Sequence, residues 1–189
     1  MRRCIELSRT ARAHGEFPFA CVICDEGGDV VAESLNRVRR DRDVTKHAEI
    51  LAIGEAQRKL GATDLGGCTL YSNAEPCPMC SFPIRETGIR KVVYALRSPL
   101  MGGYSKFAVL RSEDINRAMP EAFAEPPQVL GGVLAEEAEE AWRQWSPIAW
   151  RVIKRRGIFE GDPTVSYSRA TRPARAGFNW RRLINLIWA

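Results

Sequence analysis

The chain has 189 residues, of which 45% are hydrophobic and 27% charged, and its formal net charge is +5 at neutral pH. A chain of this length and hydrophobic content can bury one good core, so we expect a single domain plus a tail. Six cysteines do not suggest a disulfide scaffold, and no apolar run reaches signal-peptide or transmembrane length. The composition therefore argues against secreted disulfide-rich and membrane-spanning classes and predicts a reducing, cytoplasmic environment.

The residue pattern predicts alternating strands and helices. In chain order we expect a helix over 2–13, strands over 17–25 and 29–35, a helix over 45–60, a strand over 69–73, a helix over 78–87, a strand over 91–96, a broken helical region over 112–123, a short strand over 128–131 and a helix over 134–145. An opening hairpin followed by strand–helix alternation favours a mixed sheet between helical layers. We therefore predict an α/β protein, a three-layer α/β/α sandwich around a central mixed five-stranded sheet.

Two C-x-x-C pairs occur, and only one has the spacing of a metal site. Cys21 and Cys24 lie in the first predicted strand, where residues three apart point to opposite faces, so we interpret them as packing residues. Cys77 and Cys80 lie at the start of a predicted helix, where residues three apart share a face and can reach one ion. Pro78 suits the first helical position, which puts Cys77 at or near the N-cap, where the helix dipole favours a thiolate.

The string His47-Ala48-Glu49 lies thirty residues before Cys77, and together they resemble the H-x-E…P-C-x-x-C signature of zinc nucleobase deaminases, which implies that His47 is the third ligand. His47 opens the predicted helix over 45–60, which Gly61 would end. Residues two apart on a regular helix face nearly opposite ways, yet His47 and Glu49 must both approach one ion. We therefore expect His47 at the very start of the helix, where the backbone is not yet helical. The inner side of this helix would carry Ile50, Leu51, Ile53, Ala56 and Leu60.

One imidazole and two thiolates give Zn²⁺ three protein ligands, the number typical of a catalytic site that keeps its fourth position open for water. A carboxylate beside the ligands, that of Glu49, would move protons for that water. The alternatives for a C-x-x-C pair are a redox function or structural zinc. A structural site would need a fourth ligand, and the nearest candidate, Cys68, is more simply interpreted as a core residue. We predict that His47, Cys77 and Cys80 bind zinc.

The positive charge is concentrated near the C-terminus, since residues 1–150 carry a net charge of −2 and residues 151–189 a net charge of +7. A nearly neutral body offers little electrostatic footprint for nucleic acid. We divide the chain into a domain over 1–156 and a basic, Pro/Gly-containing tail over 157–189. Within the tail, residues 179–188 have the spacing of a short amphipathic helix, which would dock on protein, RNA or a membrane surface.

H-x-E followed by P-C-x-x-C is the signature of zinc nucleobase deaminases. Residues 11–96 resemble the cytidine/deoxycytidylate deaminase-like superfamily, in the branch of guanine deaminases, cytosine deaminases and tRNA adenosine deaminases. The matching segments are 17–20 with the following strand, 36–37, 43–49 and 70–80, and more loosely 92–95 and 131–137. The resemblance implies the fold of that superfamily and makes residues 1–156 a zinc-dependent deaminase domain that releases ammonia from a cyclic amidine.

The resemblance also implies roles for individual residues. Asn36 would contact the substrate with its side chain, and the backbone N–H groups of Ala48 and Cys77 would line the pocket. Glu49 would take a proton from the attacking water, pass it to a ring nitrogen and later protonate the departing ammonia.

Glu75, directly before the cysteine motif, is a further candidate substrate contact. Phe82 is another, and it departs from the family pattern, in which small residues usually follow the second cysteine. Its ring would narrow or cap the pocket. The substrate of any one relative therefore cannot be assigned to this chain. The Gly/Pro loop over 98–104 follows a predicted strand at the carboxyl end of the sheet, where ligands bind in open α/β folds.

Three functions remain open. The first is hydrolytic deamination of a nucleobase, nucleoside or related small amino-heterocycle. The second is adenosine-to-inosine editing of tRNA, in which the basic tail or the 98–104 loop would contact RNA. The third is a catalytically inactive zinc-binding module, against which Glu49 argues, since a structural site has no use for a carboxylate beside its metal. The nearly neutral body favours the first over the second. The resemblance further implies a homodimer.

Overall fold

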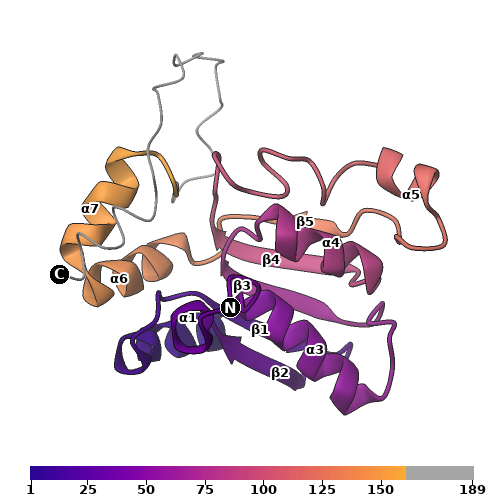
Figure 1. The fold of residues 1–189 in the computed structure, drawn as a ribbon, viewed down its shortest axis with the longest axis horizontal. Helices are drawn as coiled ribbons and strands as arrows, with labels where there is room; N and C mark the ends of the chain where they lie inside the picture. Colours follow the sequence, from indigo (N-terminus) through magenta and orange to yellow (C-terminus); the bar gives the residue numbers. More distant parts are fainter. Residues whose placement is uncertain (161–189) are drawn as a thin grey trace.

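A computed structural model describes residues 1–160 of the chain (Figure 1). Its elements, in order, are α1 (Arg2–Arg9), a 3-10 helix η1 (Thr10–His14), β1 (Ala20–Cys24), β2 (Val30–Leu35), α2 (Val38–Asp41), α3 (Ala48–Leu60), β3 (Thr69–Ala74), α4 (Pro78–Glu86), β4 (Lys91–Leu96), α5 (Asp114–Ala118), β5 (Gln128–Leu130), α6 (Ala135–Trp145) and α7 (Pro147–Arg155). Every predicted strand is present, within a few residues of its expected ends.

The five strands form one mixed sheet in the order β2-β1-β3-β4-β5. β1 pairs antiparallel with β2 and β3, whereas β3, β4 and β5 run parallel to one another. The carboxyl ends of β3 and β4 therefore lie at the same edge, and the chain leaves them towards the cysteine motif and the 98–104 loop. The predicted mixed five-stranded sheet is confirmed.

Helices cover both faces of the sheet. Alternate residues of β1 point to opposite faces, so Cys21 and Ile23 join the core under α3 and α4, while Ala20 and Val22 pack towards α1. α6 packs against α1 and β4, and α7 packs against α6 at the same end of the molecule. This arrangement is the predicted α/β/α sandwich, and it confirms Cys21 as a packing residue.

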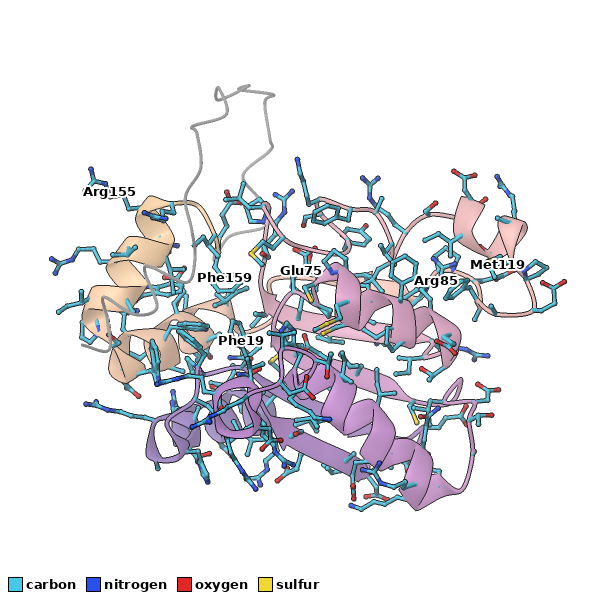
Figure 2. All side chains as sticks on the ribbon, in the orientation of Figure 1. Phe19, Glu75, Arg85, Met119, Arg155 and Phe159 are labelled. Atoms are coloured by element: carbon cyan, nitrogen blue, oxygen red, sulfur yellow. The ribbon has the colours of Figure 1, made fainter. Side chains whose placement is uncertain are left out.

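A long excursion between β4 and β5, residues 97–127, carries α5 at the end of the molecule away from α7 (Figure 1). Arg85 of α4 holds it in place, with a side chain that is 0% exposed (Figure 2). Its guanidinium donates all five of its N–H groups, at 2.7–3.1 Å, to the carbonyl oxygens of Val109, Ser112 and Ala124 and to Oδ1 of Asn116.

Two helices were not expected from the sequence. α2 is one turn long, and α7 follows α6 after a break at Ser146, whose Oγ accepts from the N–H of Ala149, with Pro147 at the first helical position. The expected inner face of α3 needs a correction, because Ile50 and Leu51 are only half-buried and Leu60, the last residue of the helix, is 46% exposed. The buried residues of α3 are Ala48, Glu49, Ala52, Ile53 and Ala56.

The packed body continues beyond residue 156, where composition placed the boundary of the domain. Ile158 and Phe159 are buried in the core beside α6 and α7, and Glu160 exchanges two backbone hydrogen bonds with Arg97. The rest of the predicted tail, including the amphipathic segment over 179–188, lies outside the described residues. Among the helices of residues 1–160, none has the length and apolarity that a membrane crossing needs.

Candidate metal centre and active-site cavity

The three candidate ligand atoms, which come from the starts of two helices, lie close together. The Nδ1 atom of His47 lies 3.6 Å from the sulfur of Cys77 and 3.4 Å from that of Cys80, and the two sulfurs are 3.7 Å apart. Within residues 1–160, this is the one group of three or more histidine, cysteine or acidic side chains that can hold a metal ion.

These separations fit a tetrahedral zinc ion. Zn–S bonds of about 2.3 Å and Zn–N bonds of about 2.0–2.1 Å place two sulfur ligands about 3.8 Å apart and a sulfur and a nitrogen about 3.6 Å apart. The ligand atoms are therefore already arranged as three corners of a tetrahedron. The fourth corner has no protein ligand among the described residues, as a catalytic site requires.

Both ligand-bearing helices begin at a ligand. His47 is the N-cap of α3, with extended backbone angles (φ −69°, ψ 150°), and Cys77 is the N-cap of α4 (φ −71°, ψ 170°) with Pro78 at the first helical position. The expectation that His47 precedes the regular helix is confirmed. Because both helix N-termini carry partial positive charge, they favour the negative sulfurs. Contacts with the Cys80 thiol and the His47 ring lower the pKa of Cys77 to about 4.

Glu49 is the second residue of α3, and it lies beside the ligands and away from bulk solvent. Its side chain is 8% exposed, and Ser72 of β3 donates a hydrogen bond of 3.4 Å to its Oε1. Burial raises the pKa of Glu49, so this carboxylate binds a proton more readily than one in water. A group that both takes and returns protons needs this property.

The centre opens into a cavity of about 260 Å³. Its polar lining consists of Asn36, His47, Glu49, Glu75, Cys77 and Ser98. Its apolar lining consists of Phe17, Phe19, Ala74, Met101, Trp142, Ile153, Ile158 and Phe159. The rings of Phe19 and Phe159, from the two ends of the described chain, meet with their centroids 6.0 Å apart (Figure 2).

The predicted loop over 98–104 forms part of the wall, through Ser98 and Met101. Glu75 holds this loop, because its two carboxylate oxygens accept from the backbone N–H groups of Ser98, Tyr104 and Ser105 and from Oγ of Ser105, at 2.6–3.0 Å. The loop approaches so closely that a Cβ on Gly102 would overlap the Glu75 carboxylate, and one on Gly103 would overlap Ser81.

The other predicted substrate contacts have different positions. Asn36 lines the cavity and is 4% exposed. Ala48 is the first residue of α3 and is buried, but it is not among the lining residues. Phe82 is 42% exposed, does not line the cavity, and packs its ring against Phe123 at 5.8 Å. The structure therefore places Asn36 and Glu75 in the lining of the cavity and leaves the ring of Phe82 outside it.

Sequence reasoning missed the wall that α6, α7 and the residues after them contribute. Trp142, Ile153, Ile158 and Phe159 all line the cavity. The signal for α7 was present, since a serine followed by proline is a typical helix start and apolar residues recur behind it.

Comparison with known proteins supports the geometry. Residues 1–96 match the family described as "Cytidine and deoxycytidylate deaminase zinc-binding region". This match spans half of the chain and contains all three candidate ligands. The chain belongs to this family. It is therefore a zinc-dependent hydrolase acting on C–N bonds, and the prediction of zinc as its cofactor is confirmed.

Several relatives share most of the domain. A probable cytosine deaminase of Schizosaccharomyces pombe is 36% identical over 144 residues, covering 73% of this chain and 85% of that protein. A solved structure from a study of A-to-I editing by tRNA:A34 deaminases has a TM-score of 0.64 and 32% identity, covering 75% of this chain and 96% of that one. A guanine deaminase from Nitrosomonas europaea has a TM-score of 0.60 and 29% identity, covering 76% and 81%.

The chain also matches a tRNA(Ile)-lysidine synthase of Deinococcus deserti, with 33% identity over 143 residues, but it spans only 25% of that protein's length. The relatives thus carry several different activities on nucleobases or RNA.

Proposed function

We propose that the chain deaminates a free nucleobase or a related planar amino-heterocycle. The observation that carries the proposal is the lining of the cavity, in which residues 1–160 contribute no lysine or arginine and eight of the fourteen residues are apolar. A phosphorylated substrate would find acidic and apolar side chains there and, among residues 1–160, no lysine or arginine for its phosphate. The volume of about 260 Å³ suits a ligand smaller than the drug-sized molecules that fill pockets of about 300–1,000 Å³.

The proposed mechanism assigns zinc binding to His47, Cys77 and Cys80. Zinc bound there supplies Lewis acidity that makes a water molecule a better nucleophile. Glu49 takes a proton from this water as the new C–O bond forms, and delivers it to the ring nitrogen of the amidine. Glu49 then takes the second proton from the new C–OH group and delivers it to the amino group. The C–N bond breaks, ammonia departs, and the carbon is left as a carbonyl. Aromatic walls such as Phe19 keep the ring in place and exclude other water.

An ammonia-release assay tests this proposal. The zinc-loaded full chain is incubated with guanine, cytosine, adenine, their nucleosides and nucleotides, and triazine and pterin analogues. We expect turnover of at least one free heterocycle, with kcat/KM at least tenfold above that of its nucleotide. Preference for a nucleotide would contradict the reasoning from the cavity lining.

The second candidate is adenosine deamination in tRNA. A groove between α6 and α7 supports it, since four cationic side chains line it: Arg143, Arg151, Lys154 and Arg155. The similarity to the structure from the tRNA:A34 deaminase study also supports it. In this case inosine would form in tRNA, whereas free adenine and adenosine would release no ammonia, and tRNA binding would weaken steeply with salt. Removal of residues 161–189 would test whether the basic tail contributes.

We also propose that the chain acts as a homodimer. The large exposed apolar side chains that a partner copy could cover include Val44, Phe82 and Phe107, which are 42–69% exposed. Light scattering coupled to size exclusion would give twice the mass of the chain, and a monomer at micromolar concentration would contradict the proposal.

A further inference from the structure

The side-chain amide of Asn36 has a defined orientation, because one of its ends is anchored to Glu16. The Nδ2 group of Asn36 donates a hydrogen bond of 2.9 Å to Oε2 of Glu16, a residue that is 1% exposed. An ionised carboxylate can only accept, so the NH2 end of the amide must face it. The oxygen end, Oδ1, forms no hydrogen bond with any residue of 1–160, and Asn36 is one of the residues that line the cavity.

Glu16 is itself held from three sides. Its Oε1 accepts from the backbone N–H of Arg40 at 2.7 Å. Its backbone oxygen accepts from the indole N–H of Trp145 at 2.9 Å, and its backbone N–H donates to Ala11 at 3.0 Å. The carboxylate therefore cannot turn away from Asn36 without leaving a buried donor unpaired, which is unfavourable. Glu16 is not among the residues that line the cavity, so it would act only through Asn36.

We infer that Glu16 is a positioning residue, which fixes Asn36 with its amide oxygen towards the cavity and so selects substrates that present an N–H donor to that oxygen. The inference deepens the proposed function, on which its substrate part rests. The selected heterocycle carries a ring N–H or a second amino group on the edge that faces Asn36. A substrate methylated at that nitrogen would leave Oδ1 unpaired in a water-poor site, which is expected to lower kcat/KM by about tenfold or more.

The substitution Glu16→Gln gives a sharp test, because it preserves the size of the side chain and reverses the direction of one hydrogen bond. The N–H of Arg40 still requires an acceptor, so the Gln oxygen must stay beside it. The Gln NH2 group then faces Asn36, whose amide must turn its own oxygen towards it. The cavity would thereby receive an NH2 donor in place of the acceptor. If Glu16 had only a packing role, this variant would behave as the wild type.

Exchanging the two functional groups should restore the original arrangement. Asn36→Asp alone places two carboxylates face to face, which is unfavourable. In the double variant Glu16→Gln/Asn36→Asp, the Gln amide donates to one oxygen of the Asp side chain, and the other oxygen faces the cavity as an acceptor. The double variant is therefore expected to regain both the hydrogen bond between residues 16 and 36 and the acceptor that faces the cavity, whereas each single variant loses at least one of them.

The first measurement needs no substrate. Urea unfolding of the zinc-loaded wild type, both single variants and the double variant gives a double-mutant cycle. We expect each single variant to lose stability and the double variant to recover most of the loss. If the double variant is as unstable as the two single losses added together, or fails to fold, the inferred orientation is wrong.

The second measurement is substrate discrimination. For the best heterocycle of the ammonia-release panel, kcat/KM is compared with that of its derivatives methylated at each ring nitrogen in turn. The wild type and the double variant should prefer one N–H form by about tenfold or more, and Glu16→Gln should lose that preference. Equal preference in all three proteins would overturn the inference. Absence of turnover of any heterocycle by the wild type would instead refute the proposed function, and the unfolding cycle would still decide the orientation of Asn36.

Discussion

Replacement of Arg85 by methionine should detach the excursion between β4 and β5 from the helix that carries both cysteine ligands. Methionine keeps much of the length of the side chain but supplies none of the five N–H donors. The carbonyl oxygens of Val109, Ser112 and Ala124 then lose their charged partner. The contact with Val109 is fully buried, whereas the others are partly buried and can recruit water.

The expected loss of stability follows from this difference. A buried hydrogen bond to a charged group contributes about 1.5–3 kcal/mol, and a partly buried one that water can replace contributes less. Removal of a buried charge offsets part of the loss, since burial already lowers the pKa of Arg85. We expect a net loss of about 2–4 kcal/mol, which for a chain of this size lowers Tm by about 5–15 °C.

Urea unfolding and thermal denaturation of the zinc-loaded protein measure this loss. Arg58→Met is the matched control, because Arg58 has a 71% exposed side chain and pairs with Glu55 one turn away on α3. Its replacement should change stability by no more than about 0.5 kcal/mol. If Arg85→Met were as stable as this control, the hydrogen bonds of Arg85 would not be what fixes the excursion.

The remaining predictions concern the centre and its loop. Glu49→Gln should retain zinc, measured by elemental analysis, and lose about 10²–10⁴-fold in kcat, because no group would transfer protons; turnover at the wild-type rate would show that another residue does so. Cys77→Ser should lower zinc content and make Tm insensitive to chelator, whereas Cys24→Ser, outside the centre, should leave both unchanged. Gly103→Ala should lower Tm and activity because its Cβ overlaps Ser81, while Gly54→Ala, which meets only a flexible arginine at 3.4 Å, should be neutral or stabilising by up to about 1 kcal/mol in circular-dichroism melts.

The metal centre could be predicted because its chemistry is local in sequence. Cys77 and Cys80 are one helical turn apart, Pro78 marks the helix start, and His47 precedes Glu49 at the start of another helix. Local physical reasons explain each of these positions, but His47 and Cys77 are thirty residues apart, and their grouping into one site was predicted from the resemblance to zinc deaminases. The strands were predictable from local patterns, since alternating and apolar runs between turn residues specify them.

The cavity could not be predicted, because its walls are brought together by tertiary packing. No local sequence pattern near Phe19 indicates that its ring will pack against that of Phe159. Phe82 comes two residues after Cys80, yet its ring packs against Phe123 and does not line the cavity. The carboxylate of Glu16 resembled an ordinary acidic residue, and only the fold brings it to Asn36.

The wall residues Ile158 and Phe159 have a consequence for the order in which the molecule is completed during synthesis. All three ligands have been made once residue 80 has left the ribosome, but the chamber above them stays open until another eighty residues follow. A chain that ends before these two residues would contain all three ligands in its sequence but lack part of the cavity wall. The intact mass of a preparation therefore has to be checked beside its metal content before it is counted as competent enzyme.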